Sequence, residues 1–104
     1  MRKVLVIGAG GIGSFLIPLL DRVDMYDITV ADPDKVETKN LPYQNFIKEA
    51  VNVNKAKWHE HSYDSVKKYV PYPILTEQQM QGYDLVVCCS VRIGYETYFL
   101  TESY

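Results

Sequence analysis

The chain has 104 residues, of which 47% are hydrophobic and 23% are charged, and its formal net charge at pH 7 is -2. This length fits a single domain over residues 1–104 and excludes a core domain followed by a separate substrate domain. The small net charge gives no electrostatic reason to expect binding to nucleic acid or to an anionic membrane surface.

No apolar run approaches the length of a membrane span, and the N-terminus lacks the long apolar segment of a signal peptide. Cys88 and Cys89 are adjacent. Neighbouring residues of a strand point to opposite faces and rarely form a disulfide, and no spaced set of Cys and His resembles a zinc site. We interpret both cysteines as apolar thiols of a cytoplasmic protein, with a redox or nucleophilic role as the alternative.

The chain opens with an apolar strand predicted over Lys3–Ile7, followed by Gly8-Ala9-Gly10-Gly11-Ile12-Gly13. A helix is predicted over Gly11–Arg22, because apolar residues recur there at helical spacing. Glycines let the backbone approach a phosphate closely, and a helix N-terminus offers unpaired N–H groups. Gly8, Gly10, Gly11 and Gly13 are therefore predicted to bind a nucleotide.

Pro18 lies in the middle of this predicted helix. Proline has no N–H group, so the carbonyl of Ser14 would lose its helical donor, at a cost of roughly 3 kcal/mol unless something compensates. We expect a local bend there.

The remaining elements alternate between strand and helix. A second strand over Ile28–Ala31 ends at Asp32-Pro33-Asp34, and a third, over Trp58–Ser62, rests on position and alternation alone. The other predictions are part-helical Gln44–Lys57, a stiff connection at Tyr69–Pro73, a short helix over Glu77–Gln81, a strand over Leu85–Cys89 and a helix over Ile93–Tyr104. This order predicts an α/β, Rossmann-like three-layer fold with a mostly parallel sheet of about four or five strands.

Asp32 directly follows the second predicted strand, where nucleotide-binding folds place a carboxylate that accepts hydrogen bonds from ribose hydroxyls. A solvated turn aspartate is the alternative. The glycine loop and Asp32 also suit an NAD-binding oxidoreductase, in which the carboxylate would favour NAD over NADP.

The next segment carries a more specific pattern. Residues 32–44 read D-x-D-x-V-x-x-x-N-L-x-x-Q, formed by Asp32, Asp34, Val36, Asn40, Leu41 and Gln44, and Val51–Ala56 reads V-N-x-N-K-A. With the Gly10-Gly11 pair, these residues resemble the ThiF-type adenylyltransferase family, which includes ubiquitin-activating enzymes and activators of sulfur-carrier proteins. Asn52 replaces a glycine of the family pattern.

The resemblance implies ATP and Mg²⁺ as cofactors, and adenylation of the C-terminal carboxylate of a ubiquitin-like or sulfur-carrier protein. It implies that Asp32 binds the ribose, that Asp34 belongs to the nucleotide site, and that Asn40 and Gln44 lie near the phosphates. Lys55 would bind phosphate and is the candidate catalytic residue, because a positioned cation stabilises the charge that develops on the phosphate. Family members are commonly dimers, so a homodimer is also implied.

Two positions depart from the family pattern. Tyr43 stands where the family has an arginine, and Val91 stands where it has the aspartate that serves magnesium. Valine cannot coordinate a hard cation, so no residue is assigned to a metal. We therefore expect an ATP-binding ThiF-like domain with weakened or lost catalysis; the alternatives are an active small adenylyltransferase and the NAD-binding oxidoreductase. Because a full doubly wound fold has further strands, we also expect either a minimal version or a C-terminal truncation.

Overall fold

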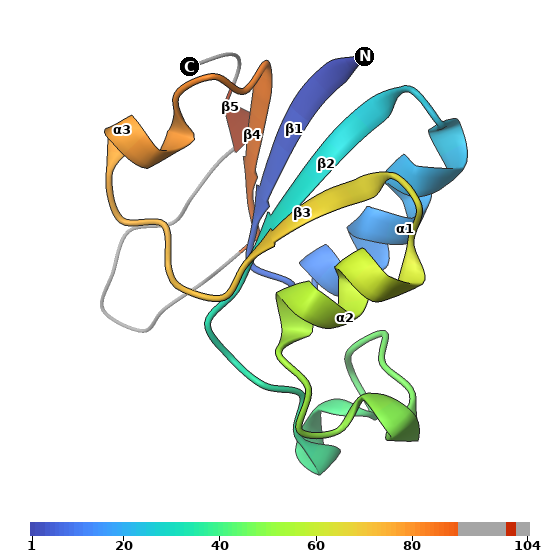
Figure 1. Cartoon of the computed structure of the whole chain (residues 1–104). Coiled ribbons are helices and arrows are strands. Elements are labelled where there is room, and N and C mark those ends of the chain that lie inside the picture. The colour runs from blue at the N-terminus through green and yellow to red at the C-terminus, as the bar shows by residue number, and fades with distance from the viewer. Residues whose placement is uncertain (90–99, 102–104) are drawn as a thin grey trace.

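The computed structural model describes residues 1–89 and 100–101. These residues form a five-stranded sheet in the order β3-β2-β1-β4-β5 (Figure 1). The strands are β1 (Arg2–Ile7), β2 (Tyr26–Ala31), β3 (Val66–Val70), β4 (Leu85–Cys88) and β5 (Leu100–Thr101). β1 pairs in parallel with both β2 and β4, β2 pairs in parallel with β3, and β5 is antiparallel to β4. The prediction of a mostly parallel sheet is confirmed.

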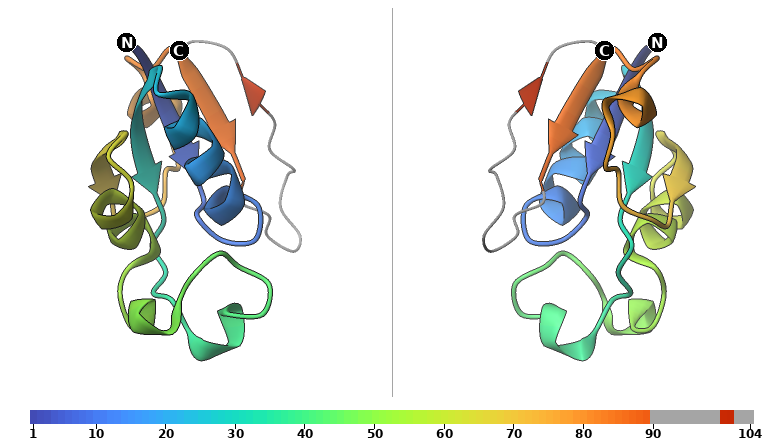
Figure 2. Two further views of the ribbon diagram at one scale, coloured as in Figure 1. Left: turned by 90° about the vertical axis from the view of Figure 1, so that its right-hand side faces the viewer. Right: turned by 90° about the vertical axis from the view of Figure 1, so that its left-hand side faces the viewer.

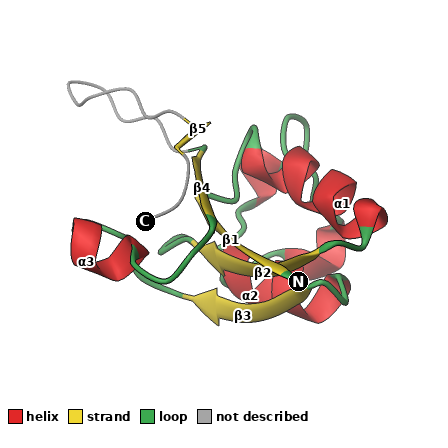
Figure 3. Ribbon diagram, turned by 90° about the horizontal axis from the view of Figure 1, so that it is seen from above, coloured by secondary structure: helices red, strands yellow, loops and turns green. Residues whose placement is uncertain are grey.

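Helices cover both faces of the sheet. α1 (Gly13–Val23) and α2 (Lys55–Ser62) lie on one face, and α3 (Glu77–Met80) lies on the other (Figures 2 and 3). Two short 3-10 helices, η1 (Thr38–Asn40) and η2 (Lys48–Ala50), fall in the long connection between β2 and α2. The three-layer Rossmann-like arrangement is thus confirmed.

Alternation along the strands divides the core between the two faces. Val4 and Val6 of β1 belong to the cluster that contains Ile17 of α1 and Ala56 of α2. Leu5 belongs to a second cluster, against which Met80 of α3 packs. Cys89 packs against the first cluster and Cys88 against the second, so the two thiols do face opposite sides, and neither forms a disulfide.

The strand predicted over Trp58–Ser62 is wrong, because these residues belong to α2. Asn54 caps this helix: its Oδ1 accepts a hydrogen bond from the Lys57 N–H at 2.9 Å. A side-chain acceptor at the N-cap satisfies a backbone donor that the first turn leaves unpaired, and so favours the helix. The part-helical prediction for Gln44–Lys57 holds only for η2 and for the start of α2.

The third strand lies farther along the chain, at Val66–Val70, and includes two residues that were predicted to be a stiff connection, Tyr69 and Val70. Most of the predicted helix over Ile93–Tyr104 falls outside the described residues. Leu100–Thr101, which are described, form β5, so the helix prediction is wrong at these two positions.

α1 continues through Pro18. The local bend that we expect there stays a prediction. Within residues 1–89 and 100–101, no helix is both long enough and apolar enough to cross a membrane.

Candidate functional site

The glycine loop connects β1 to α1 and folds back tightly on itself. Gly8 adopts a φ of 96°, which side chains disfavour, and its N–H donates to the Ala31 carbonyl at 2.8 Å. At Gly13, a Cβ atom would collide with the carbonyl oxygen of Gly8. These two positions therefore require glycine, and the compact turn sets the N-terminus of α1 directly beyond the end of β1.

Asp32 ties the end of β2 to this loop. Its Oδ2 accepts a hydrogen bond from the Ala9 N–H at 2.7 Å, and its Oδ1 accepts one from the Asp34 N–H at 2.8 Å. The residue is only 6% exposed. Since a carboxylate has about four acceptor positions, each oxygen keeps capacity for one further donor. Asp32 thus has a structural role that the sequence did not indicate, in addition to the predicted contact with ribose.

Asp34 connects the same region to α2 through its backbone. Its carbonyl oxygen accepts from the Lys55 N–H at 2.9 Å and from Asn54 Nδ2 at 3.3 Å. Asn54 Nδ2 also donates to the Asp32 carbonyl at 2.8 Å. The Asp34 side chain itself is exposed. These contacts position the start of α2 beside the loop that follows β2.

Lys55 is the first residue of α2 and is only 7% exposed. Within the described residues, its ammonium group makes no hydrogen bond and no ion pair. The ion pair found there joins Lys39 and Glu37. Next to Lys55, Ala56 lies in the same core cluster as Ala9 of the glycine loop. A long cationic side chain that is largely buried is rare unless it is paired, which makes Lys55 a strong candidate for binding an anion.

Gln44 lies against the glycine loop. Its Nε2 is 3.4 Å from the position that a Cβ atom would occupy on Gly10, and its Oε1 is buried with no hydrogen-bond partner in the described part of the chain. Asn40 is also buried, and its Oδ1 accepts from the Glu37 N–H at 2.8 Å. The amide nitrogen of Asn40, and the second acceptor position of its Oδ1, therefore remain available to a ligand.

His59 is a buried residue of α2 that sequence reasoning missed. It is fully buried between Phe46 and Tyr63, whose ring centroids lie 5.3 Å and 5.6 Å from its own. Burial lowers its pKa from 6.5 to about 4, and the nearby backbone of Ala9 acts weakly in the opposite direction. Neither ring nitrogen has a hydrogen bond of ordinary geometry to a described residue. His59 therefore supports the glycine loop as a neutral side chain.

Asn45 was also missed. Its backbone N–H donates to Ser14 Oγ at 2.9 Å, which fastens the segment after η1 to the first turn of α1. The only sequence signal was its place directly after Gln44. Of the two positions that depart from the family pattern, Tyr43 is 72% exposed, and Val91 falls outside the described residues.

No group of three or more His, Cys, Asp or Glu side chains in the described part of the chain is arranged to hold a metal ion. Burial raises the pKa of both the Cys88 and the Cys89 thiol. A raised pKa lowers the fraction of reactive thiolate, which disfavours the nucleophilic alternative.

Comparison with known proteins decides the family. The chain matches the ThiF family over residues 1–94. It belongs to that family. The adenylyltransferase and sulfurtransferase UBA4 of Yarrowia lipolytica is 33% identical over 100 residues, which cover 86% of this chain and 24% of UBA4.

Solved ThiF-like structures have the same fold. The Escherichia coli tRNA N6-threonylcarbamoyladenosine dehydratase TcdA in complex with ATP superposes with a TM-score of 0.79 at 22% identity, over 88% of this chain and 42% of TcdA. E. coli MccB with ATP gives 0.74 at 23% identity, over 86% of this chain and 29% of MccB. This ThiF domain therefore spans about a quarter to two fifths of the length of these relatives.

Proposed function

We propose that this chain is the ATP-binding domain of a ThiF-type adenylyltransferase. The observation that carries the proposal is Lys55, a largely buried cation without a described partner at the start of α2. The buried, unpartnered Oε1 of Gln44 beside Gly10 supports the same site. In the described part of the chain Gln44 Oε1 lacks a hydrogen-bond partner and the Lys55 ammonium lacks a counter-ion; a bound polyanion with hydroxyl groups would supply both.

In this proposal, each residue acts through an atom that the fold leaves available. The Lys55 ammonium binds phosphate oxygens, and the backbone N–H groups of Gly10, Gly11 and Gly13 face them from the loop. The Asp32 carboxylate accepts hydrogen bonds from the ribose hydroxyls, at the acceptor positions that the Ala9 and Asp34 N–H groups leave free. The amide nitrogen of Asn40 and the side chain of Gln44 complete the polar lining, with Asp34 at its edge.

ATP, when bound, supplies the α-phosphorus that a carboxylate oxygen of the partner attacks, with pyrophosphate as the leaving group. Lys55 then has a catalytic role, because its fixed charge stabilises the additional negative charge of the transition state. MccB has been solved with ATP and with N-formylated MccA, and UBA4 is named as both an adenylyltransferase and a sulfurtransferase. These relatives support a protein or peptide partner, and we propose a sulfur-carrier or ubiquitin-like protein that offers its C-terminal carboxylate.

The proposal includes weak catalysis by this chain. At position 43 the exposed tyrosine cannot make the bidentate phosphate contacts of an arginine, and Val91 cannot supply an oxygen ligand for Mg²⁺. Magnesium would then be held mainly by the phosphates of ATP, as Mg²⁺ commonly is. The main alternative is an active small adenylyltransferase that tolerates these two replacements.

Two further parts of the proposal concern the cellular compartment, which we propose is the cytoplasm, and the oligomeric state, which we propose is a homodimer. Adjacent free cysteines fit the reducing cytoplasm. A homodimer would bury apolar side chains that α1 and its N-cap expose, namely Ile12, Phe15, Leu19 and Val23. Light scattering at increasing protein concentration measures the oligomeric state directly.

Calorimetric titration of the chain with ATP, AMP and NAD, each with and without Mg²⁺, tests the proposed ligand. We expect ATP to bind more tightly than AMP, because Lys55 contacts phosphates that AMP lacks. We also expect ATP to bind more tightly than NAD. Tight binding of NAD without measurable binding of ATP would instead support the oxidoreductase alternative.

A further inference from the structure

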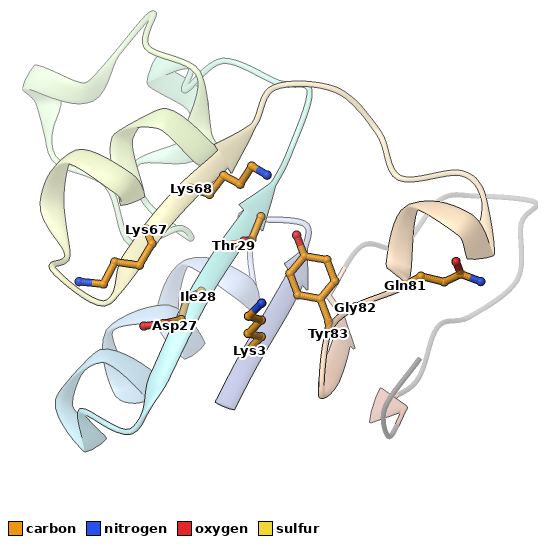
Figure 4. Close-up of a pocket in the computed structure, with 9 residues that line it drawn as sticks. All are labelled: Lys3, Asp27, Ile28, Thr29, Lys67, Lys68, Gln81, Gly82 and Tyr83. Carbon is orange, nitrogen blue, oxygen red and sulfur yellow. The ribbon is translucent and has the colours of Figure 1, made fainter. Parts of the chain in front are cut away.

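A groove of about 590 Å³ lies away from the glycine loop (Figure 4). Lys3 of β1, Thr29 of β2 and Tyr83, which precedes β4, are among the residues that line it. Lys3 lies two residues from Leu5, which belongs to the α3-side cluster, so the groove lies on the sheet face opposite α1 and α2.

The hollow exists because the connection from β3 to β4 covers only part of this face. That connection contains α3, a helix of 4 residues. Met80 of α3 packs against the cluster of Leu5, Ala31 and Val86, which come from β1, β2 and β4. In the described part of the chain, no helix lies over the neighbouring surface around Thr29 of β2 and Lys68 of β3, and these two residues line the groove together with Tyr83.

Polar groups without partners surround the groove. Thr29 and Lys68 are opposite each other in the pairing of β2 with β3. Within the described residues, the ammonium groups of Lys3 and Lys68 and the hydroxyls of Thr29 and Tyr83 make neither hydrogen bonds nor ion pairs. Figure 4 shows Lys3, Thr29 and the Tyr83 hydroxyl near the middle of the lining. Lys67 is also a lining residue, but its ammonium group points away from Tyr83.

We propose that this groove binds a small molecule that carries a phosphate group. A phosphate monoester carries a charge of about -1.5 to -2 and three strong acceptor oxygens. The two ammonium groups and two hydroxyls supply matching charge and donors, and lysine is a common phosphate ligand. The groove volume also lies within the range of about 300–1,000 Å³ typical of small-molecule sites.

Asp27 is the one acidic residue among the described residues that line the groove, and it bears on where the anion lies. It is opposite Lys3 in the pairing of β1 with β2. In Figure 4 its carboxylate points away from Tyr83. Repulsion from Asp27 therefore places the phosphate on the side of Thr29, Lys68 and Tyr83, with the ring of Tyr83 available to the remainder of the ligand.

The test uses NMR titration with phenyl phosphate and with inorganic phosphate. The chain carries Lys55→Met, so that the proposed nucleotide site competes less for phosphate. We expect saturable shifts of the Thr29, Lys68 and Tyr83 resonances, with phenyl phosphate binding more tightly. Lys68→Met should weaken binding by about tenfold, the effect of losing roughly 1.4 kcal/mol.

Lys67→Met is the matched control, because it removes the same charge from the adjacent position. We expect it to change the affinity by less than about twofold. Equal losses in the two variants would indicate general electrostatic attraction and overturn the proposal, as would the absence of shifts at Thr29 and Tyr83. With Lys55 intact, ATP affinity should be the same in wild type and Lys68→Met, so failure here is distinguishable from failure of the nucleotide site.

Discussion

The side chain of Asn45 donates a hydrogen bond from Nδ2 to the carbonyl oxygen of Ser14 at 3.0 Å. Ser14 is the residue whose helical donor is missing, because Pro18 has no N–H group. Asn45 therefore supplies from another segment the donor that the helix lacks. This contact explains how α1 accommodates an internal proline, and it holds the segment that contains Gln44 against the start of α1.

A double-mutant cycle tests this relationship. Asn45→Ala should lower the free energy of unfolding by about 1–3 kcal/mol, because it leaves the buried Ser14 carbonyl without a partner. In a Pro18→Ala background the same substitution should cost clearly less, since the alanine N–H can bond to Ser14. Urea unfolding of the four proteins measures both values. Equal losses in the two backgrounds would show that Asn45 does not compensate for Pro18.

Asp32→Asn should weaken both the fold and the nucleotide site. An amide has only one acceptor oxygen, so the bonds from the Ala9 and Asp34 N–H groups cannot both survive. We expect a loss of about 1–3 kcal/mol in unfolding free energy and a comparable loss in ATP binding. Asp34→Asn, which changes an exposed carboxylate, is the stability control. Unchanged ATP affinity in a folded Asp32→Asn protein would remove Asp32 from the nucleotide site.

His59 predicts a dependence of stability on pH. Its pKa is lowered from 6.5 to about 4 in the folded chain, so the unfolded chain binds a proton more readily. The free energy of unfolding should therefore fall as the pH drops below about 6.5, by about 3 kcal/mol once the pH reaches the folded pKa. Denaturant unfolding at a series of pH values measures this decrease.

His59→Phe should remove this contribution, whereas His61→Gln, at an exposed position of the same helix, should keep it. Acid effects from carboxylates are common to all three proteins. If wild type and His59→Phe lost stability in parallel between pH 7 and pH 4, the neutral state of buried His59 would not be the cause.

The apolar runs of β1, β2 and β4 made these strands predictable, because strands buried on both faces of a parallel sheet are nearly continuous in hydrophobic residues. β3 was missed since Lys67 and Lys68 interrupt its pattern; both lysines are exposed. α2 was mistaken for a strand over Trp58–Ser62 because its buried positions are Lys55, Ala56 and His59, which give no apolar helical period.

The site was predictable where a motif specified it and not where long-range contacts did. The pattern from Asp32 to Gln44 identified the family, which the match over residues 1–94 confirms. The contacts that Asn45 makes to Ser14 and that Asn54 makes to the Asp32 carbonyl join segments far apart in the chain. Such side-chain bonds depend on the folded geometry, and no local spacing predicts them.

Catalysis should be weak in the natural chain and partly restorable. ATP–pyrophosphate exchange with carrier proteins and Mg²⁺ is the assay, and each lost electrostatic contact typically lowers the rate by about 10²–10³. Tyr43→Arg combined with Val91→Asp should raise exchange above that of wild type, and the effects of the two substitutions need not be additive. Robust exchange by the unmodified chain would show that other residues replace the missing pair and would contradict weakened catalysis.

The most direct test of the nucleotide site is the calorimetric affinity for ATP of wild type, Lys55→Met and Lys57→Met. Lys55 is largely buried at the start of α2, where its N–H donates to the Asp34 carbonyl, whereas Lys57 is exposed two residues farther along α2, so the pair separates a specific contact from general charge. We predict that Lys55→Met weakens ATP binding by about 1.5–3 kcal/mol, the range for hydrogen bonds to charged groups, and that Lys57→Met leaves it nearly unchanged. Equal affinity for ATP in wild type and in a folded Lys55→Met protein would contradict the proposed site.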